Sequence, residues 1–186
     1  NTYCKSMVRI LADDLIGTTP HLQLKTDDKA LNSRIERDFM KWMNASNMAE
    51  KLRQMKRSQI VDGESFGILA TNPRLTTPVK LDMMVIEADR VAEPTGTDIQ
   101  SVYQDGIKYD SFGNPTSYTV LKTHPGDFYF NSMDASVFSA DYVLHWYDSD
   151  RAEQQRGIPA ITPALPLFAQ LRRYTLAVLA AAETAA

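Results

Sequence analysis

Four residues near the C-terminus, Arg156-Gly157-Ile158-Pro159, divide the chain into two parts with different patterns. A polar stretch, 148–155, precedes them, and an apolar helical pattern begins at Thr162 and runs to the last residue. Glycine permits backbone conformations that are closed to other residues, and proline prevents a helix from continuing through it. We therefore predict a mixed body over residues 1–161 and one long helix over residues 162–186.

Helical periodicity dominates the first sixty residues. Asn47 and Glu50 have the spacing of a capping box, which predicts the start of a helix. Alternating polar and apolar residues at 21–25 predict a short strand, and Asp27 and Asp28 are typical of a turn in front of a helix. Apolar residues recur with the spacing of amphipathic helices in three ranges: 7–16, 31–43 and 47–61.

After Asp62-Gly63 the apolar residues change to a period of about two, which indicates strands. The clearest local signal is a hairpin within 106–121, where two alternating runs flank the turn residues Gly113-Asn114-Pro115. The fold class is therefore α+β: N-terminal helices, antiparallel strands and a long C-terminal helix. Further strands are predicted at 64–70, 79–86 and 140–147.

The charge balance argues against a general nucleic-acid binder. The 186 residues carry a formal net charge of -3, so the chain lacks the positive field that supplies most non-specific affinity for DNA or RNA. One short basic helical face is more typical of a solvated surface than of a phosphate-binding site. The cations of that face are Lys51, Arg53, Lys56 and Arg57.

Two further features concern the setting of the chain. Its single cysteine, Cys4, cannot form an internal disulfide, which is consistent with a reducing compartment. The chain begins without methionine and its last helical pattern has no stop signal, so we expect an internal piece of a longer protein.

Catalytic motifs are not evident. No phosphate-cradling glycine loop and no nucleophile elbow occur, and His21, His124 and His145 do not have the spacing of metal ligands. Glu87 and Asp89, with His124 or His145, are the remaining candidates for a metal-dependent site. The alternative is a strand end whose acids pair with Arg90 and cap nearby backbone. We favour that alternative and predict no catalytic residue, no cofactor and no metal ligand.

Read together in order, these residues resemble the portal protein of tailed bacteriophages, of the lambda type. Four segments carry the resemblance. No segment is diagnostic alone, but all four occur in the family order and together span nearly the whole chain. They are Leu11–Gln23; Asp62-Gly63-Glu64-Ser65-Phe66; Ile86–Val91 followed by 105–110, Gly113 and Tyr118; and His145 with Gln155-Arg156-Gly157-Ile158-Pro159.

The resemblance implies a structural, non-catalytic subunit of a ring, usually of twelve copies, at one vertex of the phage head. Double-stranded DNA would pass through the ring channel without sequence-specific binding, driven by a separate terminase. Capsid, scaffold and head-tail adaptor proteins would be further partners, with assembly in the host bacterial cytoplasm and no membrane. The fragment would be the wing or body, and its last helix would lead towards a stem.

Within that resemblance, we expect Arg156, Gly157 and Pro159 to form a structural junction. A guanidinium suits bidentate contacts with a carboxylate, so Arg156 is expected to pair with Glu87 or Asp89. Two other functions stay open at this point: a metal-dependent hydrolase or nuclease that uses Glu87, Asp89 and a histidine, and a generic protein-binding adaptor module.

Overall fold

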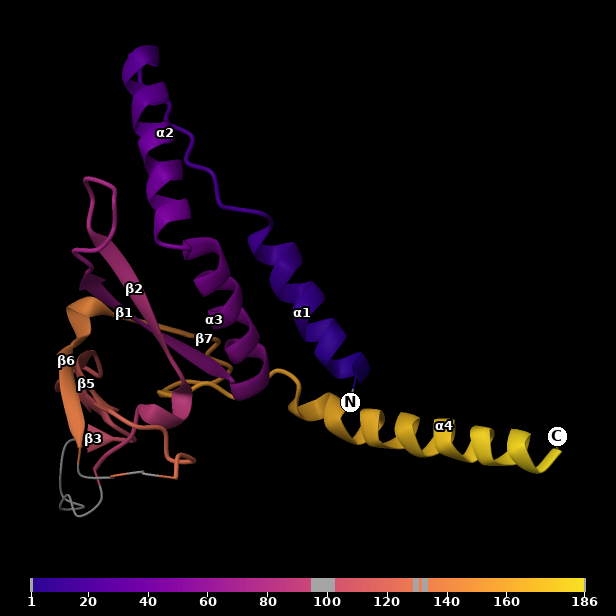
Figure 1. Ribbon diagram of the computed structural model, residues 1–186. Helices are drawn as coiled ribbons and strands as arrows, with labels where there is room; N and C mark the ends of the chain where they lie inside the picture. The colour runs from indigo at the N-terminus through magenta and orange to yellow at the C-terminus, as the bar shows by residue number, and fades with distance from the viewer. Residues whose placement is uncertain (1, 95–102, 129–130, 132–133, 186) are drawn as a thin grey trace.

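The computed structural model describes residues 2–94, 103–128, 131 and 134–185. Three helices come first: α1 (Thr2–Ile16), α2 (Lys29–Ala45) and α3 (Met48–Asp62). The last helix, α4 (Leu165–Ala185), follows a short 3₁₀ helix, η3 (Thr162–Ala164), and projects away from the rest of the molecule (Figure 1). The α+β fold class is confirmed. None of the described helices is long and apolar enough to cross a membrane.

Two small antiparallel sheets form the body between α3 and α4. The first has the order β2-β1-β7, with strands β1 (Glu64–Thr71), β2 (Leu81–Ile86) and β7 (Val143–Tyr147). The second has the order β3-β4-β5-β6, with strands β3 (Tyr103–Gln104), β4 (Ile107–Tyr109), β5 (Pro115–Leu121) and β6 (Ala135–Ser139). The short 3₁₀ helices η1 (Ala88–Arg90) and η2 (Ala140–Tyr142) follow β2 and β6.

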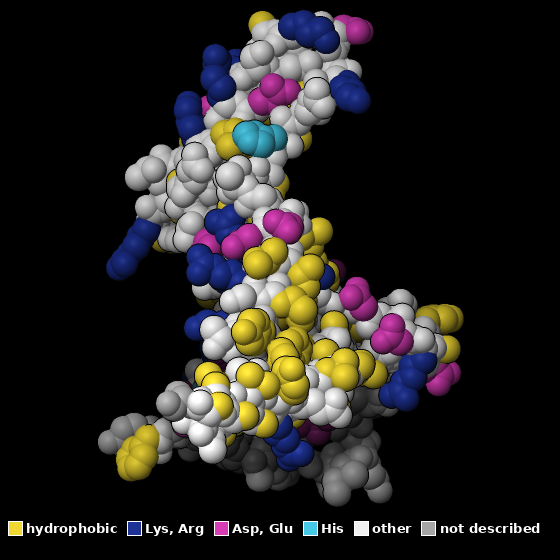
Figure 2. Space-filling model, turned by 90° about the vertical axis from the view of Figure 1, so that its right-hand side faces the viewer, with side chains coloured by type: hydrophobic (Ala, Val, Ile, Leu, Met, Phe, Trp, Pro, Cys, Tyr) yellow, Lys and Arg dark blue, Asp and Glu magenta, His cyan; other side chains and the backbone are white. Residues whose placement is uncertain are grey.

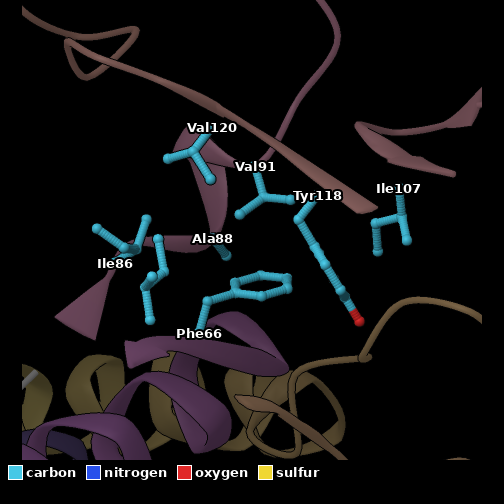
Figure 3. Packing of buried hydrophobic residues seen from close by; sticks show 8 residues of the cluster. Phe66, Ile86, Ala88, Val91, Ile107, Tyr118 and Val120 are labelled. Carbon is cyan, nitrogen blue, oxygen red and sulfur yellow. The ribbon is translucent and has the colours of Figure 1, made fainter. Parts of the chain in front are cut away.

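The main core lies between the two sheets. Phe66 of β1 packs towards Tyr118 of β5, and the centroids of the two rings are 5.9 Å apart (Figure 3). Because β1 is covered on both faces, its first five residues are all buried, as expected for a central strand. The core residues are Phe66, Ile68, Ile86, Ala88, Val91, Ile107, Tyr118 and Val120.

Two smaller clusters attach the helices. Met43 and Met55, from α2 and α3, pack with Met83 against the outer face of the first sheet. At the other end of α3, Ile60 packs with Val8 of α1 and with Ile161, which lies one residue before η3. Ile161 also donates its backbone N–H to the Ile60 carbonyl at 3.4 Å, so the start of the last helical segment is held against α3.

The hairpin prediction is confirmed and has a clear local cause. Asp110 accepts hydrogen bonds from the backbone N–H groups of Phe112 and Asn114, both at 2.8 Å. Gly113 takes a positive φ of 83°, which glycine adopts without steric cost. The turn therefore carries β4 directly into β5.

The strand predicted at 21–25 is wrong. That segment has no strand neighbour; side chains of α2 bind its backbone instead. The Glu36 carboxylate accepts from Leu24 N–H at 2.8 Å, and the Asn32 amide donates to the Leu24 carbonyl at 3.4 Å. The alternation thus reflects an extended segment that lies along a helix.

The capping box predicted at Asn47 and Glu50 is also wrong. Asn47 has the left-handed φ of 51°, and its side chain makes no capping hydrogen bond. Only Ser46 and Asn47 separate α2 from α3, so Asn47 is used for the tight turn. The Glu50 carboxylate instead forms ion pairs with Arg53 and Arg57 of the same helix.

The strand predicted at 140–147 is too long at its start. Residues 140–142 form η2, and the strand β7 begins only at Val143. Strand β6 at 135–139 was not predicted, because its sequence, Ala-Ser-Val-Phe-Ser, is short and weakly apolar. The η2 turn lets the chain leave the second sheet and enter the first.

Asp28 caps the N-terminus of α2, and its removal has a defined expected cost. Its carboxylate accepts from Leu31 N–H at 2.9 Å. Asp28→Ala should lower the free energy of unfolding by about 1 kcal/mol, since an orphan helix donor loses its partner. Asp27→Ala is the matched control and should stay within about 0.5 kcal/mol of the parent. Urea denaturation measures both, and equal losses would contradict the cap.

Candidate functional site

The predicted junction is a close crossing of two backbone segments. Gly63 ends α3 with a positive φ of 93°, and Gly157 lies directly against it. A Cβ built on Gly157 would be 2.0 Å from the Gly63 carbonyl oxygen, and one built on Gly63 would be 2.7 Å from the Gly157 carbonyl carbon. Both positions therefore require glycine. Gly63 requires it for its positive φ and for the close approach, whereas Gly157 requires it for the close approach alone.

Glu64, the first residue of β1, is the centre of this crossing. Its side chain is 5% exposed, and four donors converge on its two oxygens. Oε1 accepts from Arg156 Nε at 2.7 Å and forms an ion pair with Arg156 Nη2 at 2.6 Å. Oε2 accepts from Gly157 N–H at 3.0 Å and lies 2.9 Å from His145 Nε2. A buried carboxylate is tolerated only with such compensation.

The balance of burial and hydrogen bonding determines the charge of Glu64. Burial alone would raise the pKa of its carboxyl group, but hydrogen bonds from His145, Arg156 and Gly157 outweigh burial and hold that pKa below its ordinary value. Burial raises the pKa of the neighbouring Tyr118 hydroxyl to about 12, so it keeps its proton at neutral pH. Glu64 is therefore an anion in a largely buried setting.

Arg156 connects Glu64 to the second sheet. Its Nη1 donates to the carbonyls of Val91 at 3.1 Å and Asp105 at 2.7 Å, and its Nη2 lies 3.4 Å from the Ala88 carbonyl. Its guanidinium carbon lies 5.6 Å from the centroid of the Phe66 ring. One planar side chain thus connects β1, the η1 turn after β2 and the turn before β4. We call Glu64, His145, Arg156 and Gly157 the joint.

His145 and Gln154 complete the surroundings of the joint. The His145 ring stacks on Phe66, with centroids 4.3 Å apart, and its Nδ1 lies 3.5 Å from the Tyr118 hydroxyl. Gln154 is buried, and its side-chain amide donates to the carbonyls of Asp148 and Arg156. The polar loop before Arg156 is therefore held in a fixed shape.

The partner predicted for Arg156 is corrected by these contacts. Arg156 pairs with Glu64, not with Glu87 or Asp89, and both nitrogens that face the carboxylate share one oxygen. Arg90 does not pair with these acids either; it donates to the carbonyls of Leu121 at 2.9 Å and Lys122 at 3.1 Å. The sequence carries one signal for Glu64, which is a charged residue at the start of an otherwise mainly apolar strand.

Glu87, Asp89 and His124 do come together, but not as a metal site. His124 Nε2 lies 3.4 Å from Glu87 and 3.6 Å from Asp89, while its Nδ1 accepts from Gly126 N–H at 2.9 Å. Because Nδ1 accepts, the ring proton lies on Nε2 and points at the acids, which opposes metal binding there. In the described part of the chain, no group of three or more ligating side chains is placed to hold a metal ion.

The basic face of α3 is occupied by internal contacts. Lys51 pairs with Asp82, Arg57 pairs with Glu50, and Arg53 bonds Glu50 at 3.0 Å and the Gly17 carbonyl at 2.7 Å. Lys56 donates to Gln59 and lies 5.5 Å from the centroid of a Trp146 ring. These cations stabilise the fold, so they form no free phosphate-binding surface.

The joint connects the first sheet, the turns of the second sheet and the segment that leads to α4. A family model described as phage portal protein, lambda family, matches residues 1–186, and the chain belongs to that family. This confirms the resemblance seen in the sequence and identifies the chain as a structural, non-catalytic protein. A comparison with curated proteins finds no match.

The joint also collects most of the segments that carry the family resemblance. Glu64 comes from the segment 62–66, and Ala88 and Val91 come from 86–91. Asp105 begins 105–110, while His145, Arg156 and Gly157 belong to the last segment. Sequence features that are far apart in the chain therefore meet at one point in the fold.

The pH dependence of stability should report on Glu64. Folding lowers the pKa of Glu64. Its contribution to the free energy of unfolding is therefore complete at pH values above the unfolded pKa, near 4.5, and is lost as the pH falls through the folded pKa. Between about pH 5 and pH 3 the wild-type unfolding free energy should therefore fall more steeply than that of Glu64→Gln. Urea denaturation over this range measures both slopes. Glu183→Gln, on exposed α4, should keep the wild-type slope, and equal slopes for Glu64→Gln would contradict the assignment.

Proposed function

We propose that this chain is the wing or body part of a subunit of a portal ring, the channel for packaging and ejection of double-stranded DNA at one phage capsid vertex. The observation that carries the proposal is the family match over residues 1–186. Family membership implies an oligomeric ring and capsid partners. The finer assignments proposed here are a ring of twelve copies, a terminase, a scaffold and a head-tail adaptor, with assembly in the host cytoplasm.

The electrostatics support a conduit. A channel through which DNA slides should avoid many tight phosphate contacts, because each one adds to the affinity. The net charge is -3, and the four cations of α3 are held by Asp82, Glu50, Gln59 and backbone groups. These contacts favour a conduit over a DNA-gripping protein.

We further propose that residues 1–161 act as a body and residues 162–186 as the helix that leads to the stem. Arg156, Gly157 and Pro159 would set the direction in which α4 leaves the body. In support, Gly157 is packed on Gly63, and Ile161 is buried against Val8 and Ile60. The exit of α4 is thus held on both sides of Pro159.

Electron microscopy of the protein expressed from its complete gene tests this function. Rings with a central hole are expected, and discrete monomers would contradict the portal assignment. The competing nuclease function predicts divalent-dependent DNA cleavage that Asp89→Ala removes. We expect no cleavage by the wild type or by Asp89→Ala, because the His124 proton points at the acids that would hold the metal.

A further inference from the structure

A hollow of about 570 Å³ lies beside the joint, and this volume is within the range of small-molecule sites. Its walls come from the hairpin of β4 and β5, from strand β7 and from the loop 153–155. Phe112 and Glu153 are exposed, whereas Tyr118 and the His145 side chain are buried. We call this hollow the tyrosine pocket. Its aromatic lining residues are Tyr109, Phe112, Tyr118, His145 and Tyr147.

The rings of the tyrosine pocket stand in two orientations. The Tyr147 and His145 rings pack on each other, with centroids 4.4 Å apart and planes inclined by 32°, whereas the Tyr118 ring is set at 88° to His145. Figure 3 shows that Tyr118 extends from β5 with its hydroxyl pointing away from Val91 and Val120. A flat aromatic ligand stacks well on only one orientation, whereas a compact cation is attracted to ring faces from several directions. The rings therefore favour a cation.

The charge of the lining also favours a cation. Among the described residues that line the pocket, Glu153 is the only acid and none is lysine or arginine. Glu153 forms no ion pair with another described residue, whereas the Glu64 carboxylate that contacts His145 is compensated by Arg156. The positive φ of Glu153, 62°, is uncommon for a residue with a side chain, and such strain is typical of functional positions. Its carboxylate attracts cations to the pocket and repels phosphates.

An unpaired acceptor belongs to the same lining. The side-chain amide oxygen of Gln155 is buried and has no hydrogen-bond partner among the residues that the structure describes. The neighbouring Gln154 differs, since its amide donates to the carbonyls of Asp148 and Arg156. Buried acceptors are normally paired, so a ligand that brings an N–H donor would satisfy Gln155. An ammonium group brings three such donors together with a positive charge.

We infer that the tyrosine pocket binds an alkylammonium group, carried by a small amine or by a lysine side chain. The ammonium lies against the tyrosine rings, near Glu153, and donates to the Gln155 oxygen. The alkyl chain packs on Phe112 and Val143. Such a ligand contacts the hairpin, β7 and the loop before Arg156 at once, so it ties the two sheets together beside the joint. This binding site is independent of the portal function.

The probe for this site is n-butylammonium, added as its chloride to the whole 186-residue chain at constant ionic strength. Heteronuclear NMR of the protein amides and proton NMR of the probe both measure binding. We expect a dissociation constant of roughly 1 mM, as is reasonable for so small a ligand. The protein shifts should centre on Gly113, Tyr147 and Gln155, and the ring currents should move the probe protons upfield.

Two further small molecules test the charge of the ligand. 1-Butanol has nearly the same size as the probe but no charge, and it should bind roughly 10-fold more weakly or worse. Butanoate should not bind, since Glu153 repels it. Butanol also controls for contact with exposed apolar side chains, which gather over α1 and α4 in the view of Figure 2. That surface would take up the alcohol as readily as the amine.

Two exposed residues of the pocket test its chemistry by substitution. Glu153→Gln should weaken butylammonium binding about 5-fold through the lost charge, and Phe112→Leu about 3-fold through the lost ring. Glu183→Gln and Tyr174→Leu remove like groups from exposed α4 and should bind like the wild type. Circular dichroism should be unchanged for all of these variants, since each position is exposed.

A lysine peptide identifies the source of the ammonium group. If acetyl-Gly-Lys-Gly-amide binds as well as butylammonium, the pocket accepts a lysine side chain; if only butylammonium binds, it takes a free amine. Three results would overturn the inference: no binding of butylammonium up to about 20 mM, equal binding of 1-butanol, or an affinity unchanged by both pocket variants. None of these results involves ring formation, so failure of the portal function is recognised separately by electron microscopy.

Discussion

Gly157→Ala should lower the free energy of unfolding by roughly 3 kcal/mol or more, the upper range for overpacking a closely packed site. The added Cβ would be 2.0 Å from the Gly63 carbonyl oxygen and 2.5 Å from its carbon. Both are backbone atoms at the junction of α3 and β1, so no flexible side chain can move aside. Relief requires the two segments to separate, which also lengthens the hydrogen bond from Gly157 N–H to Glu64. Thermal and urea denaturation measure the loss.

Gly113→Ala is the matched control for this substitution. Gly113 has a positive φ of 83° and nothing within 4 Å of the position of an added Cβ. Its replacement should cost about 1 kcal/mol through backbone strain alone. Gly157 has no positive φ, so its larger cost would come from contact. A Gly157→Ala variant as stable as Gly113→Ala would show that the crossing is looser than described.

Arg156→Lys should cost about 2 to 4 kcal/mol, although the charge is kept. An ammonium is a compact donor and cannot reach Glu64 together with the Val91 and Asp105 carbonyls, which the planar guanidinium does from two nitrogens, Nε and Nη1. Carbonyl groups beside the joint then lose their partners. The loss should appear in urea denaturation and, in the complete protein, as a smaller yield of rings.

Arg57→Lys is the control for Arg156→Lys. Arg57 pairs with Glu50 at the surface, where both side chains are about one-third exposed. Arg57→Lys should change the free energy of unfolding by less than about 1 kcal/mol, since exposed ion pairs contribute little to stability. If both exchanges cost the same, the branched contacts of Arg156 would not be what stabilises the joint.

Local patterns were sufficient for most regular elements of the fold, although strand β6 was missed because its sequence is short and weakly apolar. The helices, the hairpin and the strands β1 and β2 follow from periodicity and turn residues, because neighbouring residues carry those signals. Other errors arise where a packing contact or a tight turn overrides a local pattern. Residues 21–25 alternate but bind the side of α2, and Asn47 is used for a turn rather than a cap.

The joint was predicted only in part, for a related reason. Arg156 and Gly157 were singled out from their residue types, but Glu64 lies 92 residues away from Arg156 in the sequence. A guanidinium indicates that a carboxylate is near without indicating which one. The convergence of the resemblance segments on this point required the fold, since sequence order does not show which of them meet.

The close crossing of Gly63 and Gly157 has a mechanical consequence. Force applied along or across α4 reaches the chain at Ile161 and then at Gly157, where main chain meets main chain without an intervening flexible side chain. From there Arg156 passes the load to β1 and to the turns that flank both sheets. The crossing therefore couples the direction of α4 to both sheets through main-chain contact and one planar side chain, so the orientation of the helix and that of the two-sheet body depend on each other.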